Sequence, residues 1–181
     1  SLPKGRFNSV CFVYRDSLYV FGGTDNSSNM NEIVRYDLST QNSGEWTTIA
    51  KVNEANQRGG VAFVVEDKVY AGLGEKSNGI RNGFYVSSDS LTKWELIPSI
   101  PAQLGVISSG VYDEQKKSFF MIDNDGKIWE YNLTTEQWTS RSLWIRMKNY
   151  HMFMLDGSIY ILGQDIYQKN KFTVYNPIWD N

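Results

Sequence analysis

Ser17-Leu-Tyr-Val-Phe-Gly-Gly23 is a short apolar stretch that ends in two glycines, and similar stretches occur three more times along the chain. They are Lys68-Val-Tyr-Ala-Gly-Leu-Gly74, Ser118-Phe-Phe-Met-Ile-Asp-Asn124 and Ser158-Ile-Tyr-Ile-Leu-Gly-Gln164. Their aligned aromatic residues are 51, 50 and 40 positions apart, namely Tyr19, Tyr70, Phe120 and Tyr160. Self-similarity with a period of about 40 to 50 residues is the signature of a repeat architecture. The chain is therefore predicted to consist of four repeats.

Each repeat has the pattern of four strands. Its apolar runs are short, rich in β-branched and aromatic residues, and bounded by turn residues, which is typical of strands. Asp156-Gly157 predicts a tight hairpin, because a type I′ turn needs positive φ at both central residues. A tyrosine and then a tryptophan follow in each repeat and mark the third and fourth strands, as Tyr36 and Trp46 do in the first. Four antiparallel strands per repeat without helices predict an all-β fold of propeller blades.

The expected blades cover about residues 5–50, 57–99, 103–142 and 146–181 of one domain that spans 1–181. The glycine pair Gly22-Gly23 indicates backbone with positive φ, which glycine adopts without a Cβ penalty. Asp123-Asn124 stands at the same place in the third repeat, and Asp and Asn tolerate the left-handed region best among the other residues. The same conformation is therefore predicted there.

At this point the pattern resembles a known family. Tyr19-Val-Phe-Gly-Gly23, followed by Tyr36-Asp37-Leu38 and Trp46, is similar to a kelch repeat. An arginine precedes the aligned tyrosine by 13, 12 and 14 residues in repeats one, two and four, at Arg6, Arg58 and Arg146. The resemblance covers essentially the whole chain and is weakest in repeat three, which lacks the arginine and the glycine pair. It implies a kelch-type β-propeller similar to the central domain of galactose oxidase.

The resemblance carries two further expectations. Kelch-like blades usually close as rings of six or seven, so four blades suggest an open arc of a larger ring, with the missing blades in cis. Phe84-Tyr-Val-Ser-Ser-Asp-Ser90 and Asp125-Gly-Lys-Ile-Trp-Glu-Tyr131 resemble stretches of kelch-containing envelope proteins of Bacteroidota. The cell envelope or the extracellular space is therefore the favoured compartment, with the cytoplasm as the alternative.

Composition excludes some partners and gives little support to catalysis. A net charge of −2 provides no basic footprint for nucleic acid, and no apolar run approaches the roughly 18 residues of a membrane span. Copper chemistry of the galactose oxidase kind needs several histidine or cysteine ligands, whereas the chain has one of each, His151 and Cys11. We predict no metal, no cofactor and no catalytic residue. His151 is expected to be an ordinary strand residue, and Cys11 a buried small hydrophobe.

Three carboxylates leave an alternative open. Asp123, Asp125 and Asp165 follow second strands, where a pair of acids could do acid/base chemistry. An aspartate after a strand more often stabilises a turn through hydrogen bonds to its own backbone. A kelch-type sugar enzyme such as a sialic acid mutarotase is kept as the alternative function.

The main functional prediction is a non-catalytic interaction module that presents polar loops on one propeller face to a protein or a carbohydrate. Residues 24–31, 75–82 and 164–170 form polar, Asn-rich loops after second strands, and functional residues concentrate on such loops. The arginines could bind carboxylates of an acidic peptide or glycan, or could pair with partners between blades. The predicted ligand-binding residues are Arg6, Asn26, Asn29, Arg58, Lys76, Asn78, Arg81, Arg146 and Asp165.

Overall fold

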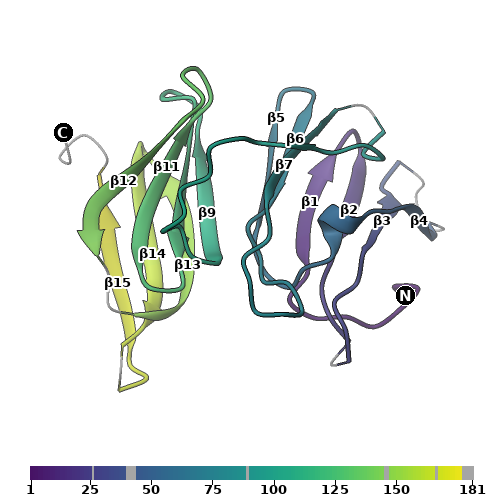
Figure 1. Ribbon diagram of the computed structural model, residues 1–181, viewed down its shortest axis with the longest axis horizontal. Helices are drawn as coiled ribbons and strands as arrows, with labels where there is room; N and C mark the ends of the chain where they lie inside the picture. The colour runs from purple at the N-terminus through teal and green to yellow at the C-terminus, as the bar shows by residue number, and fades with distance from the viewer. Residues whose placement is uncertain (26, 40–43, 89, 145–146, 166, 177–181) are drawn as a thin grey trace. The chain divides into compact units, whose positions relative to one another are not determined.

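The computed structural model describes residues 1–25, 27–39, 44–88, 90–144, 147–165 and 167–176 (Figure 1). Strands dominate these residues, and the only helical element among them is the single 3₁₀ turn η1 (Asn53–Ala55). In the described part of the chain, no helix has the length and apolar character needed to cross a membrane. The predicted all-β fold is confirmed.

The strands form four antiparallel sheets, one for each repeat. Sheet 1 consists of β1 (Val10–Tyr14), β2 (Ser17–Phe21), β3 (Glu32–Asp37) and β4 (Trp46–Lys51). Sheet 2 consists of β5 (Val61–Val65), β6 (Lys68–Gly72), β7 (Phe84–Ser88) and β8 (Glu95–Leu96). Sheet 3 consists of β9 (Ile107–Asp113), β10 (Ser118–Asp123), β11 (Lys127–Asn132) and β12 (Gln137–Trp144). Sheet 4 consists of β13 (Lys148–Leu155), β14 (Ser158–Gln164) and β15 (Asn170–Tyr175).

Neighbours in sequence are neighbours in every sheet, so each repeat is a meander. A fourth strand of sheet 4 would fall on residues 177–181, outside the described residues. The chain divides into two compact units, Ser1–Pro98 with sheets 1 and 2, and Ser99–Asn181 with sheets 3 and 4. We call them unit 1 and unit 2. The expectations of one domain and of an open arc stay predictions.

Each sheet has two distinct faces. We call the face that carries the aligned aromatic residue face A, and the opposite face is face B. In unit 1, face A of sheet 1 packs on the aliphatic face B of sheet 2, with β1 beside β5. The aromatic side contributes Phe12, Tyr19 and Phe21, which meet Val69 and Ala71.

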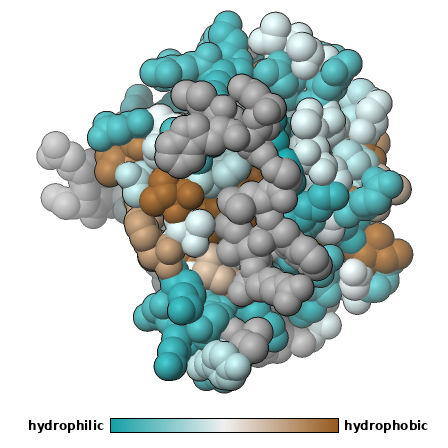
Figure 2. Space-filling view, turned by 90° about the vertical axis from the view of Figure 1, so that its left-hand side faces the viewer, coloured by the Kyte–Doolittle hydropathy of each residue, from teal (hydrophilic) through white to brown (hydrophobic). Residues whose placement is uncertain are grey.

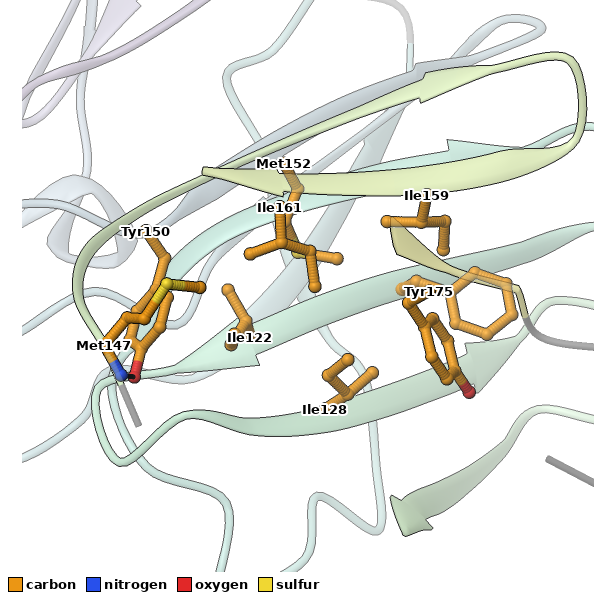
Figure 3. Packing of buried hydrophobic residues seen from close by; sticks show 9 residues of the cluster. Ile122, Ile128, Met147, Tyr150, Met152, Ile159, Ile161 and Tyr175 are labelled. Atoms are coloured by element: carbon orange, nitrogen blue, oxygen red, sulfur yellow. Dashed lines mark hydrogen bonds between the residues drawn. The ribbon is translucent and has the colours of Figure 1, made fainter. Parts of the chain in front are cut away.

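Unit 2 repeats this arrangement. Phe120, Ile122 and Ile128 on face A of sheet 3 form one core with Ile159 and Ile161 on face B of sheet 4 (Figure 3). All five side chains have no exposed surface. β9 lies beside β13, as β1 lies beside β5 in unit 1. Both units therefore join neighbouring sheets in the same way, face A onto face B.

The turns confirm part of the backbone prediction. Asp156 and Gly157 have φ of 50° and 73°, as a type I′ hairpin requires. Gly22 and Gly23 have φ of 64° and 97°. The prediction for Asp123-Asn124 is wrong, because neither residue has positive φ. There the Asp123 side chain organises the turn, as described below.

The prediction that Cys11 is buried is also wrong, because its side chain is exposed on face B of sheet 1. Alternation along β1 sends Phe12 into the core between sheets 1 and 2 and its neighbour Cys11 to the opposite face. Nearby side chains still remove enough water to raise the pKa of the thiol.

Candidate functional site

Arg6 has a structural environment. Its Nη2 donates to Glu32 Oε2 at 3.0 Å and its Nη1 to the carbonyl oxygen of Gly22 at 3.2 Å. The arginine side chain is 1% exposed, against 23% for the glutamate. A guanidinium that is this buried ties the chain before β1 to the end of β2 and the start of β3. These contacts support the alternative in which the arginine pairs within the fold.

The other two arginines described in the predicted set are also engaged. Arg58 makes a two-point ion pair with Glu75, with Nε and Nη2 at 3.1 and 3.0 Å from the two carboxylate oxygens. Hydrogen bonding and charge attraction from Glu75 raise the pKa of Arg58. Arg81 donates to the carbonyl oxygen of Asn82 at 2.9 Å, and burial lowers the pKa of its guanidinium.

The remaining predicted residues of unit 1 lie on its loops. Asn29 Nδ2 donates to the Glu75 carbonyl oxygen at 2.8 Å, which links the loop after β2 to the loop after β6. Asn78 Oδ1 accepts the backbone N–H of Ile80 at 3.2 Å, and Lys76 is exposed on the same loop. Asn26 and Arg146 also belong to the predicted set, but they lie outside the described residues. The last member of the set, Asp165, is described below.

Two of the candidate acids are turn residues. Asp123, with 1% of its surface exposed, accepts the backbone N–H groups of Asp125 and Lys127 at 3.0 and 2.9 Å on Oδ1, and Trp129 Nε1–H at 2.9 Å on Oδ2. Asp165 Oδ1 accepts two backbone N–H groups, both at 2.9 Å, two and four residues further on. In both sheets of unit 2 an aspartate thus closes the loop after the second strand by accepting backbone N–H groups two and four residues further on.

A recess of about 270 Å³ lies at the loop end of sheet 4, on face A. It is lined by the polar residues Asn149, His151, Gln164, Asn170 and Lys171 together with Leu162 and Gly163. Three amides form a row across the three strands, because Asn149 Nδ2 donates to Gln164 Oε1 at 3.1 Å and Gln164 Nε2 donates to Asn170 Oδ1 at 3.5 Å. The two residues at the ends of the row, Asn149 and Asn170, are exposed.

Local backbone geometry shapes this recess. The register of β13 shifts between Lys148 and His151, and Asn149 within this bulge has φ of 54°. Bulges re-aim side chains at sheet ends. Gly163 lets the strands approach closely, since a Cβ there would lie 3.0 Å from the Lys148 carbonyl oxygen.

Among the described residues of the predicted set, Asp165 is the one that pairs with the lining of this recess. Its Oδ2 is 3.7 Å from Nζ of Lys171, so it forms an ion pair with the one lysine or arginine among the described residues of the recess lining. His151 was expected to be an ordinary strand residue, and the structure adds that its exposed ring lines the recess. His151 lies opposite Leu162 on face A. The alternation of side chains along the strand was the signal in the sequence that could have predicted this position.

Metal ligands do not gather in the described part of the chain. No three His, Cys, Asp or Glu side chains among those residues lie close enough together to hold an ion.

Comparisons with known proteins concern the fold and the first repeat. Residues 5–53 match the family model described as Kelch motif. The chain is similar to the solved structure described as "Structure of YjhT", with a TM-score of 0.68 and 11% sequence identity. The alignment covers 95% of this chain and 66% of that one, so the chain spans just under two thirds of its length. Curated proteins gave no match by sequence. At this identity the structural likeness concerns the fold alone.

Proposed function

We propose that this chain, which carries a kelch motif in its first repeat and has the fold of a kelch-type β-propeller, is a non-catalytic binding module. We further propose that its ligand is a carbohydrate. The amide row of sheet 4 is the observation that supports this proposal most. It combines donors and acceptors on neighbouring strands, which suits the paired donor and acceptor character of sugar hydroxyls. A protein ligand is the other class that a propeller face could take.

The charge balance of the recess favours a neutral glycan. Among the described residues of its lining, Lys171 is the one lysine or arginine, and Asp165 pairs with it at 3.7 Å. Phe172, which is 56% exposed, follows Lys171 on β15 and lies on the same face as Asn170. Apolar surface is visible in Figure 2, which views the left-hand side of Figure 1. An exposed aromatic ring beside amides offers an apolar platform with polar groups at its edge.

The enzyme alternative, a sugar mutarotase, receives no comparable support. It needs carboxylates that are available for proton transfer. Asp123 is held by three hydrogen-bond donors, and Asp165 by two backbone N–H groups and Lys171. These contacts explain both residues as parts of turns.

Glycan and peptide arrays probed with the whole chain test the proposal. We expect binding to neutral glycans, a loss of at least tenfold in affinity for Asn149→Ala and for Asn170→Ala, and none for Asn78→Ala, a matched surface amide in unit 1. Peptide binding without glycan binding would replace the carbohydrate with a protein ligand. Absence of both, or equal loss in the control, would refute the proposed site.

We also propose that further blades in cis complete the propeller. The basis is the physical requirement that a blade face with large apolar side chains be covered. Neither the number of those blades nor their sequence enters the carbohydrate proposal.

A further inference from the structure

The loop between β6 and β7 contains the same reactive dipeptide twice, as Asn78-Gly79 and Asn82-Gly83. In an Asn-Gly pair the backbone nitrogen of the glycine can attack Cγ of the asparagine, because glycine has no Cβ to block the approach and its backbone reaches many conformations. The N–Cγ bond forms, and the side-chain nitrogen takes the glycine N–H proton and leaves as ammonia. Water then opens the succinimide ring to aspartate or isoaspartate. The fold therefore decides which of the two asparagines reacts.

The environment of Asn78 is open. Asn78 and Gly79 are both exposed, and the one hydrogen bond of the Asn78 side chain to a described residue is that of Oδ1 with the N–H of Ile80, at 3.2 Å. A Cβ built on Gly79 would have Glu75 Oε1, at 3.9 Å, as its nearest described neighbour. The Gly79 N–H donates to the carbonyl oxygen of Lys76 at 2.9 Å. Release of the attacking nitrogen thus opens one exposed turn and leaves the sheet intact.

The environment of Asn82 is closed. The residue is 1% exposed, and its Nδ2, the group that would leave, donates to the Glu54 carbonyl oxygen at 2.7 Å and to Gln57 Oε1 at 3.0 Å. Its Oδ1 accepts the Gly83 N–H at 2.9 Å. A Cβ built on Gly83 would lie 2.7 Å from neighbouring side chains, so the space around this glycine is filled. Reaction at Asn82 requires the end of sheet 2 to open.

We infer that Asn78-Gly79 is a site of spontaneous deamidation in the folded chain, and that the fold protects Asn82-Gly83. The reaction puts a carboxylate on the exposed loop that also carries the Arg58–Glu75 ion pair. One added negative charge changes the formal net charge from −2 to −3, so the chain matures into two charge forms. The isoaspartate product also lengthens the main chain inside the turn that ends at Gly79. This inference is independent of the carbohydrate proposal, whose recess lies in unit 2.

Trypsin separates the two sites, because it cleaves after Lys76 and Arg81 and gives the peptides 77–81 and 82–93. The full chain is kept in mildly alkaline buffer, either folded or unfolded in guanidinium chloride, and both peptides are followed by mass spectrometry against a digest of fresh protein. In the folded chain we expect Asn78 to deamidate at least tenfold faster than Asn82, because an exposed turn opens at much lower free energy than a buried sheet end. In the unfolded chain the two rates should become similar.

Gly79→Ala tests the chemistry directly, because the added methyl group stands beside the attacking nitrogen. We expect it to slow deamidation of Asn78 at least tenfold. Gly59→Ala is the matched control, since Gly59 has a similar positive φ, +66° against +77°, and open space around its new Cβ. This control should leave the rate at Asn78 as in the parent chain. Equal rates at Asn78 and Asn82 in the folded chain, or an unchanged rate at Asn78 in Gly79→Ala, would overturn the inference.

Discussion

Replacement of Asp123 by alanine is expected to destabilise the fold by about 4 kcal/mol. The carboxylate is buried and accepts three hydrogen bonds, two from backbone N–H groups and one from the Trp129 indole. Hydrogen bonds to a charged group contribute roughly 1.5 to 3 kcal/mol each. We take the low end because three bonds that share one side chain are not additive. The variant also leaves these three donors without their acceptor.

Urea unfolding at pH 7 measures this loss, and the slope of the transition should stay unchanged. Asp165→Ala is the matched comparison, because this aspartate closes the corresponding loop of the next repeat with the same pair of backbone N–H bonds but has no indole donor and is 17% exposed. We expect it to cost about 1 to 2 kcal/mol. Asp123→Asn keeps one acceptor oxygen and should recover about half of the alanine loss.

The structural role of Asp123 would be refuted by an alanine loss below about 1 kcal/mol, or by equal losses at the two positions. If the parent chain converts a sugar and Asp123→Asn folds normally but does not, the alternative function as a sugar mutarotase would be supported instead. If Asp123→Ala is as stable as the parent chain and binds glycans equally well, the recess of sheet 4 stays the proposed site, and the hydrogen bonds of Asp123 do not stabilise the fold.

Three further predictions concern conformation and titration. Gly22→Ala should lower the free energy of unfolding by more than about 2 kcal/mol, because φ is +64° and the new Cβ would lie 2.6 Å from a backbone oxygen. The control Gly59→Ala has a similar φ but no atom within 4 Å of the new Cβ, so it should cost about 1 kcal/mol in the same urea assay. Hydrogen bonds from Lys4 and from the turn that follows lower the pKa of Asp25. The ionised carboxylate therefore stabilises the fold above the unfolded pKa of about 4, and this contribution is lost as the pH falls. In Tm scans from pH 7 to 3, an Asp25→Asn variant that is as sensitive to acid as the parent chain would contradict this role. Partial burial raises the pKa of Cys11, so its labelling rate should reach half-maximum above about pH 8.5, and a lower midpoint would count against the described environment.

The strands and their pairing were predictable because their signals are local. The aromatic at position 19 and the glycines that follow it set one strand and its end, and the Asp156-Gly157 pair set a hairpin that the structure confirms. The conformation of Asp123 was not predictable from residue preference, since three hydrogen bonds to its side chain decide the turn.

The predicted site was less accessible to sequence reasoning. The partner of Arg6 lies 26 residues away and that of Asn29 lies 46 residues away, so nothing near either residue indicates whether its side chain is available for a ligand. The recess of sheet 4 combines residues from three strands and a bulge at Asn149, and its amides are joined by side-chain hydrogen bonds across strands. Among the predicted residues that the structure describes, only Asp165 lies close to it, through its ion pair with Lys171.

The sequence by itself determined a fourfold kelch-like repeat of short antiparallel strands, because alternation, turn residues and period act over a few residues each. The tertiary structure alone decided which face of each sheet is covered, which arginines are engaged, and where amides meet at a sheet end. Those outcomes depend on contacts between segments far apart in the chain, such as Phe12 against Val69. Phe12 and Phe153 occupy equivalent positions in their repeats, and packing makes one core and leaves the other exposed.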